Sequence, residues 1–401
     1  MNKTQFLEEL SRRLEGLSDA ERRIALDFYA ELISDRMEEG MSEEEAVAAL
    51  GSIDQIVRDA APELQSMVQS KPQTPPSMPD RSRTAFHEPV RAISSSSGSA
   101  NISVLCAALP EGTTALVEYR LPKDASCTCR IQDGMLYVQY TSQRRTFSLM
   151  ELLRGETGAS IQVTLADRAL VRGEITSSSG DAVLSGLAFS GSLNVSSSSG
   201  DISLKDVSTQ GECSVSSHSG DLTLFTFASG SLRAQTVSGD ANLQNARIDG
   251  PCAVQSTSGD TLIVDAQCGG ALQLYSTSGD VEARDVLAGD VSASAVSGDV
   301  MLRRIEGRSA SAESSSGDVA LENIRSDSVT AVSKSGDIEV HDVDAQRLKL
   351  STISGDIEGT LTGEYDFRAH SGSGSVRAPK SHGSRCVDAQ SVSGDVTLHT
   401  R

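Results

Sequence analysis

A Ser-Gly pair recurs twelve times between residues 179 and 394, at intervals of 19 or 20 residues. Eleven of the twelve pairs continue into Asp, so the chain repeats one short unit over more than half of its length. A fixed period of this length indicates a repeat architecture in which each unit packs on its neighbours. The repeated glycines are Gly180, Gly200, Gly220, Gly239, Gly259, Gly279, Gly298, Gly317, Gly336, Gly355, Gly374 and Gly394.

Each repeat contains two short segments of alternating apolar residues. After the glycine, apolar side chains lie two and four residues downstream, as in Ile202 and Leu204. Before the glycine, they lie seven and five residues upstream, as in Leu193 and Val195. A period of two places every second side chain on one face of a β-strand. Each repeat therefore predicts two strands, one on either side of the Ser-Gly turn.

The short period also determines how these strands pair. Two strands in 19 or 20 residues leave no room for a crossover helix, so successive repeats must stack as coils with equivalent strands side by side. The sequence predicts a mainly β fold, a parallel β-solenoid (β-helix) of about twelve 19–20-residue coils over residues 176–401. Its core must be narrow, because small side chains occupy several inward positions. These residues are Ala293, Ala310, Ala312, Ala331 and Ala389.

The aspartates after the repeated glycines would form a row along one edge of the solenoid, which we call the Asp ladder. Residues 91–401 contain 37 acidic and 25 basic residues, so the ladder supplies nearly all of the acidic excess. Like charges about 5 Å apart repel. Calcium between the carboxylates, or backbone N–H groups at each turn, could offset that repulsion. We expect the N–H groups, because calcium solenoids use a denser Gly-Gly-x-Gly-x-Asp repeat. Ser375 replaces the twelfth aspartate, and the ladder consists of Asp181, Asp201, Asp221, Asp240, Asp260, Asp280, Asp299, Asp318, Asp337, Asp356 and Asp395.

The serine before each glycine occurs in all twelve repeats, among further hydroxyl residues such as those of Ser196–Ser199 and Ser314–Ser316. Stacked hydroxyls can satisfy one another and the backbone of the turn. We therefore expect a hydroxyl ladder that links the coils. A surface for ligands is the alternative.

Residues 1–68 form a different domain, because their apolar period changes from 2 to 3.6. Phe6 and Leu10 mark a first helix, and the capping boxes Ser18–Glu21 and Ser42–Glu45 open a second and a third. A fourth helix follows, which completes a small all-α bundle. Our candidate partner-binding residues lie on the second helix and are Phe28, Tyr29 and Leu32.

Two segments separate this bundle from the regular repeats. Residues 69–89 contain five prolines and predict an extended linker. Residues 90–175 predict a degenerate entry that caps the solenoid, with altered copies of the repeat at Ser97–Ser99 and Gly158–Ile161. Within it, Phe147–Leu153 predicts a short amphipathic helix that covers the core, with docking on a membrane or a partner as the alternative.

Two family resemblances follow from these patterns. The bundle resembles the bacterial HAAS signalling domain in its Leu17-Ser18 start, its Phe28-Tyr29 pair and its Leu50-Gly51-Ser52 turn. That resemblance implies a role in signalling or protein contact. The Ser-Gly-Asp repeats resemble the bacterial putative-adhesin family of β-strand repeat proteins, whose function is unknown. This second resemblance implies the fold alone.

Composition excludes several classes of partner. The chain carries a net charge of −20 with a pI near 4.7, which disfavours nucleic acid and anionic lipid. Trp is absent and aromatics make up 3% of the chain, so stacking platforms for bases or sugars are scarce. No stretch approaches 18 apolar residues and the N-terminus lacks a secretion signal. We expect a cytoplasmic protein, unless a partner carries it to the membrane.

The seven cysteines are an odd number without the spacing of a disulfide framework. Cys213 and Cys252 occupy inward positions, so we expect small core residues in a reducing compartment. Cys127 and Cys129 are one residue apart, whereas zinc and redox motifs separate two cysteines by two residues. We therefore expect no metal at this pair.

No nucleophile elbow, phosphate loop or His-Glu-x-x-His motif occurs, so the sequence offers no catalytic residues. We expect a non-enzymatic scaffold whose bundle contacts a signalling or envelope-stress partner. One alternative is an end-to-end filament, because the last repeat, Ser393–Thr400, stops after its strand and would leave unpaired backbone groups. The others are a calcium-binding or adhesin-like solenoid, and a polysaccharide-active β-helix enzyme, for which this repeat leaves little room for loops.

Overall fold

The computed structural model describes residues 2–14, 42–48, 82–122, 125–142, 159–380 and 383–401, together with single positions between 22 and 53. It divides into two compact units. The N-terminal unit comprises residues 1–80 with 121–126 and 142–159, and the second unit comprises residues 81–120, 127–141 and 160–401. The predicted second helical capping box and the segment Phe147–Leu153 lie outside the described residues.

The described part of the N-terminal unit contains α1 (Lys3–Arg13) and α3 (Glu43–Ala48). The Asn2 side chain caps α1 by accepting a hydrogen bond from the Gln5 backbone N–H at 2.9 Å. The predicted box before α3 is confirmed, because the Ser42 backbone N–H donates to a Glu45 carboxylate oxygen at 3.0 Å.

A polar contact and a small core join the two helices. The Lys3 backbone N–H donates to Glu43 Oε1 at 2.9 Å. Phe6, Leu10 and Leu14 are buried, as their spacing predicts. The ring of Tyr29 packs edge to face on Phe6 with 6.0 Å between the ring centroids.

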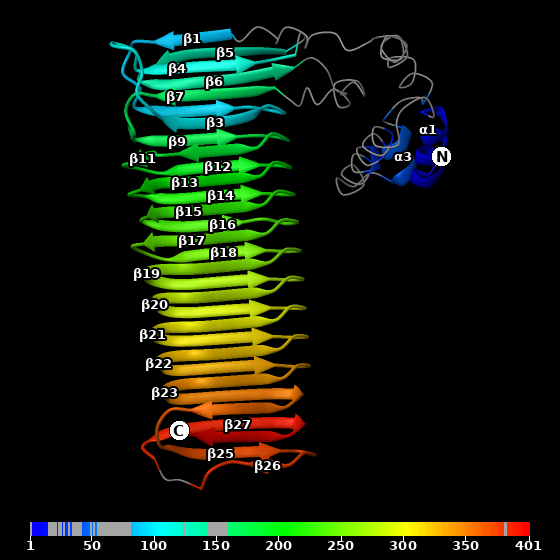
Figure 1. Cartoon of the computed structure of the whole chain (residues 1–401), viewed down its shortest axis with the longest axis vertical. Helices are drawn as coiled ribbons and strands as arrows, with labels where there is room; N and C mark the ends of the chain where they lie inside the picture. Colours follow the sequence, from blue (N-terminus) through cyan, green and yellow to red (C-terminus); the bar gives the residue numbers. More distant parts are fainter. Residues whose placement is uncertain are drawn as a thin grey trace, which may run out of the picture. The chain divides into compact units, whose positions relative to one another are not determined.

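The second unit is the predicted parallel β-solenoid (Figure 1). In its regular part, residue pairs such as Ile202 with Leu222 and Leu222 with Ala241 lie side by side in parallel strands, one repeat apart. The strands of this part are β8 (Ala169–Leu170), β9 (Arg172–Thr176), β10 (Ala182–Ser185), β11 (Ala188–Phe189), β12 (Leu193–Ser197), β13 (Ile202–Thr209), β14 (Glu212–Ser217), β15 (Leu222–Ser229), β16 (Ser231–Gln235), β17 (Ala241–Ile248), β18 (Cys252–Ser256), β19 (Thr261–Ser276), β20 (Val281–Ala295), β21 (Val300–Ser314), β22 (Val319–Ser333) and β23 (Ile338–Ser354).

Each coil contributes one more inward pair than the sequence predicts. In β13, Ile202 and Leu204 face inward, as expected. Asp206 then adopts a left-handed conformation with φ of 52°, and the strand continues with Val207 and Thr209 inward. This kink recurs with φ between 50° and 55° and defines the left-handed corner. Its residues are Asp206, Thr226, Asn245, Asp265, Asp285, Arg304, Asn323 and Asp342.

The core is as narrow as the alanine positions predict. All five inward alanines named above are at most 2% exposed. Small side chains let the two sheets approach closely, and the aliphatic columns fill the remaining space.

At the N-terminal end, the order of coils in space departs from the order in the chain. β2 lies between β6 and β9, and β3 lies between β7 and β10. β1 pairs antiparallel with β4, and β4 pairs antiparallel with β7. Residues 82–86, which we predicted to be linker, are therefore a strand of the solenoid. The strands here are β1 (Ser82–Phe86), β2 (Ala92–Ser96), β3 (Asn101–Cys106), β4 (Ala115–Arg120), β5 (Ala125–Gln132), β6 (Met135–Ser142) and β7 (Ser160–Leu165).

The C-terminal end shows the same kind of insertion. β27 lies between β23 and β25, and β28 lies between β24 and β26. The last repeat is thus paired on both sides, and the coil before it in sequence ends the stack. Our prediction of a bare edge at Ser393–Thr400 is wrong, because the chain steps past one level and then returns to it. The strands are β24 (Ile357–Leu361), β25 (Tyr365–Ser371), β26 (Val376–Arg377), β27 (Arg385–Ser393) and β28 (Val396–Thr400).

Candidate interaction surface along the Ser-Gly-Asp edge

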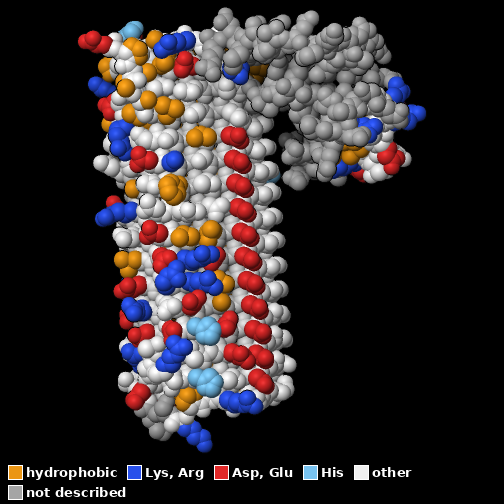
Figure 2. Space-filling view, viewed as in Figure 1, with side chains coloured by type: hydrophobic (Ala, Val, Ile, Leu, Met, Phe, Trp, Pro, Cys, Tyr) orange, Lys and Arg blue, Asp and Glu red, His pale blue; other side chains and the backbone are white. Residues whose placement is uncertain are grey.

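The Asp ladder forms a continuous column of carboxylates along one edge of the solenoid (Figure 2). The backbone N–H of each ladder aspartate after Asp181 donates to Oδ1 of the ladder residue one coil away, at 2.7 to 3.1 Å. The sequence predicts N–H donors from the same turn, whereas the structure supplies them from the neighbouring coil. Each carboxylate therefore links two coils, and this charge-assisted hydrogen bond offsets the repulsion along the column.

Neutral residues occupy both ends of the ladder. Asn101 stands before Asp181 and accepts the Asp181 backbone N–H through Oδ1 at 3.0 Å. Ser375, which appears in the sequence as an internal gap, follows Asp395 at the other end and donates its backbone N–H to Asp395 Oδ1 at 2.8 Å. Hydrogen bonds from Ser375 hold the pKa of Asp395 below its ordinary value.

The Asp ladder leaves few free oxygen ligands for a metal ion. One oxygen of each carboxylate already accepts a backbone N–H, and cations such as calcium need six to eight oxygen ligands. Within the described ranges, no group of three or more His, Cys, Asp or Glu residues is arranged to hold a metal ion.

A hydroxyl ladder exists, but it lies three residues before the glycine in all repeats except that of Gly298, and not at the invariant serine. Ser276 is typical: its Oγ accepts from the Gly279 backbone N–H at 2.9 Å and donates to the Gly259 carbonyl at 2.9 Å. The invariant serine is exposed in most coils. Residues that make one or both of these bonds are Ser177, Ser197, Ser217, Thr236, Ser256, Ser276, Ser314, Ser333, Thr352, Ser371 and Ser391.

The glycine column is explained by how closely the coils approach. None of the twelve repeated glycines has the positive φ that favours glycine. At each position, however, a Cβ would lie well inside 3.0 Å of a backbone carbonyl oxygen in the adjacent coil. The turns therefore stack backbone on backbone, and only glycine leaves the space that this requires.

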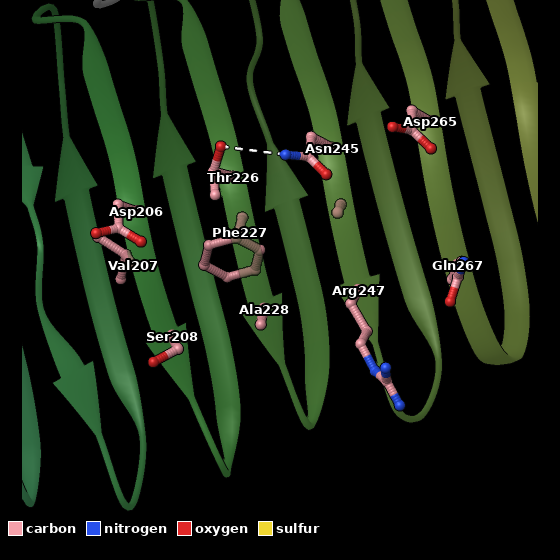
Figure 3. A pocket seen from close by; sticks show the side chains of 11 residues that line it. Asp206, Val207, Ser208, Thr226, Phe227, Ala228, Asn245, Arg247, Asp265 and Gln267 are labelled. Carbon is pink, nitrogen blue, oxygen red and sulfur yellow. Dashed lines mark hydrogen bonds between the residues drawn. The ribbon is translucent and has the colours of Figure 1, made fainter.

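An open groove of about 370 Å³ runs beside the left-handed corner (Figure 3). Asp206, Thr226, Asn245 and Asp265 line one side, and the amide of Asn245 donates to the Thr226 hydroxyl at 3.3 Å. Asp206 and Asp265 are three coils apart, about 14 Å at the usual strand spacing. Their carboxylates therefore do not converge, as the polar groups of a small-molecule site would.

Two family models match this chain. The model described as Toastrack DUF4097 matches residues 117–284 and 267–401, which is more than half of the sequence. The chain belongs to the Toastrack DUF4097 family. The HAAS model matches residues 5–59 of the N-terminal region. Both predicted resemblances are thereby confirmed.

Two solved structures are similar to this Toastrack chain at low identity. One is described as a putative adhesin from Bacteroides fragilis, with 12% identity and a TM-score of 0.26 over 80% of this chain and 97% of that chain. The other is described as a putative cell adhesion protein from Clostridium sporogenes, with 7% identity and a TM-score of 0.17 over 80% of this chain and 100% of that chain. No curated protein matches the sequence.

The second unit, which is the solenoid, holds all seven cysteines as free thiols. Cys213 and Cys252 are buried in the core, at the inward positions that the repeat predicts. Cys127 Sγ and Cys129 Sγ are 3.5 Å apart on β5. Their hydrogen bond raises the pKa of Cys127 and lowers that of Cys129.

Of the three candidate partner-binding residues in the HAAS region, the structure describes Tyr29 alone. Tyr29 is 5% exposed and packs on Phe6, so its ring belongs to the core of the helical unit. Phe28 and Leu32 lie outside the described residues. In the described part of the chain, no helix has the length and apolar character needed to cross a membrane.

Proposed function

We propose that this Toastrack protein is a non-enzymatic scaffold, in which a stiff acidic solenoid carries an N-terminal HAAS unit that contacts another protein. The observation that carries the proposal is how the repeated polar side chains are used. The aspartates and the buried hydroxyls of the repeat form hydrogen bonds with the backbone of adjacent coils. The polar side chains that recur most often therefore serve to hold the stack rigid.

A stiff stack whose polar side chains do not converge on a small-molecule site suits a spacer or a display surface. The Asp ladder gives one edge a continuous negative charge, which favours basic partners and repels acidic ones. The match to the HAAS family supports a contact role for the other unit, whose exposed positions include Glu8 and Glu44.

Site-specific photo-crosslinking in native lysate tests this proposal with the full chain. A photoreactive residue at Glu8 on α1 or Glu44 on α3 should give discrete adducts with one or a few proteins. The same residue at the exposed positions Glu212 and Arg233 of the solenoid serves as the matched control. Adducts that form equally well from the solenoid positions, or from none of the four, would contradict a contact role for the HAAS unit.

A further inference from the structure

The outermost coil at the C-terminal end consists of β25 and β26. β25 pairs with β27 and β26 pairs with β28, each along one edge. Among the described strands, none pairs with the other edge of either. Unpaired edges present rows of N–H and C=O groups that readily pair with another chain.

This end also leaves the apolar interior partly open. Val376 on β26 is 43% exposed, although Val396, its neighbour one level inward, is fully buried. Phe367 and Ala369 on β25 face the same interior and are only partly buried. Terminal repeats normally carry a polar outer face, so an apolar end surface indicates a contact.

The N-terminal end is different. The antiparallel strand β4 covers β7 there, and β1 covers β4. β1 presents exposed Ser82, Arg83 and Ala85, and charged, short edge strands discourage further pairing. A head-to-tail polymer would require this N-terminal end to bind the C-terminal end, whereas one self-complementary end forms a closed pair with two-fold symmetry.

We propose that the C-terminal end docks on the same end of a second copy of this chain, through antiparallel pairing of the two β25 strands. Charge selects the register. With Phe367 on the two-fold axis, Asp366 of one copy lies opposite Arg368 of the other. With Arg368 on the axis, two guanidinium groups would face each other, which is unfavourable.

In this register the two cores become continuous. Phe367 of one copy lies opposite Phe367 of the other, Ala369 lies opposite Tyr365, and β25 gains its second neighbour. The proposed dimer does not depend on the HAAS contact. It also replaces the open-ended filament that the sequence suggests, because a self-complementary interface closes with two copies.

Sedimentation equilibrium of the full chain over about 1 to 200 µM tests the proposal. A dimer of twice 42.1 kDa is expected, with no larger species as concentration rises. Arg368→Asp should raise the dissociation constant at least about tenfold, because it places like charges opposite each other. The double variant Asp366→Arg with Arg368→Asp should restore the dimer.

A matched control separates this effect from damage to the fold. Arg247 and Asp249 form an equivalent exposed pair two residues apart, with Arg Nε and Asp Oδ1 separated by 3.8 Å, in the middle of the solenoid. Arg368 Nε and Asp366 Oδ2 are also 3.8 Å apart. Arg247→Asp should leave the dimer intact. A monomer at the highest concentration, assemblies beyond the dimer, or failure of the charge swap to restore association would overturn the proposal.

Discussion

The Ser-Gly-Asp corner and the left-handed corner are the two regions of the solenoid that differ most in how strictly they restrict the sequence. The first keeps Ser and Gly in all twelve repeats, whereas the second accepts Asp, Asn, Thr and Arg. At the glycine, a Cβ would strike the backbone of the next coil. At the left-handed corner, the cost of a side chain is conformational, and Asn and Asp pay least. Close contact between coils therefore restricts the residue type at a position more strictly than local backbone strain does.

Gly259→Ala should have the largest effect, because its Cβ would clash with the Gly239 carbonyl oxygen of the adjacent coil. We expect a loss of about 4 kcal/mol or more in the free energy of unfolding, measured by urea denaturation. Gly289→Ala is the matched control, since its nearest backbone atom, the Gly270 oxygen, is 3.3 Å away. If both variants lose the same stability, close approach of the coils does not explain the glycine column.

Ser276→Ala should cost about 1 to 3 kcal/mol, because it leaves the Gly279 N–H and the Gly259 carbonyl without their buried partner. The reciprocal substitution is also possible, since the buried Ala295 occupies the same position of the repeat before Gly298. Ala295→Ser should stabilise the protein by about 1 kcal/mol. A destabilised serine variant would show that this coil lacks room for the hydroxyl ladder.

Asp280→Ala should cost about 1 kcal/mol, because the Asp299 N–H loses its acceptor across the coil. Asp280→Asn keeps an oxygen acceptor and should change the free energy of unfolding by less than about 0.5 kcal/mol. The melting temperature, measured at matched ionic strength, should not change when calcium is added. A calcium-dependent rise in the melting temperature, abolished by Asp280→Asn, would favour a metal ladder.

Thr226→Asn should have a small effect of the opposite sign at the left-handed corner. Thr226 has a φ of 52°, which a β-branched residue adopts at a cost, and Asn can still accept the bond from Asn245. We expect a gain of about 0.5 to 1 kcal/mol in urea denaturation. Thr223→Asn, on the exposed face of the same strand, should give no gain, and an equal gain there would remove the conformational explanation.

Much of the fold follows from column positions that can be compared within the sequence. Ile202, Leu204, Leu193 and Val195 predict both strands of their coil, and their burial confirms the prediction. The alternation does not predict the inward pair Val207 and Thr209, because the left-handed kink shifts it by one residue. Because several residue types occur at that corner, no recurring residue in the sequence indicates where the kink lies. The bonding partner of each aspartate was also missed, since a residue one period away is adjacent only after the coils stack.

The repeat, the parallel stacking, the narrow core and the row of carboxylates can all be predicted from the sequence, because each depends on side chains that recur at a fixed period. Which coils are neighbours at the two ends becomes apparent only in the folded chain. Val387 and Ala389 separate Leu348 and Leu350 from Phe367 and Ala369, although either coil offers the same apolar pattern. Equivalent repeats are interchangeable as neighbours, so their order depends on how the connecting segments close in three dimensions. That order moves Ser375 to the end of the Asp ladder and leaves β25 and β26, rather than the last strand of the chain, as the open end of the solenoid.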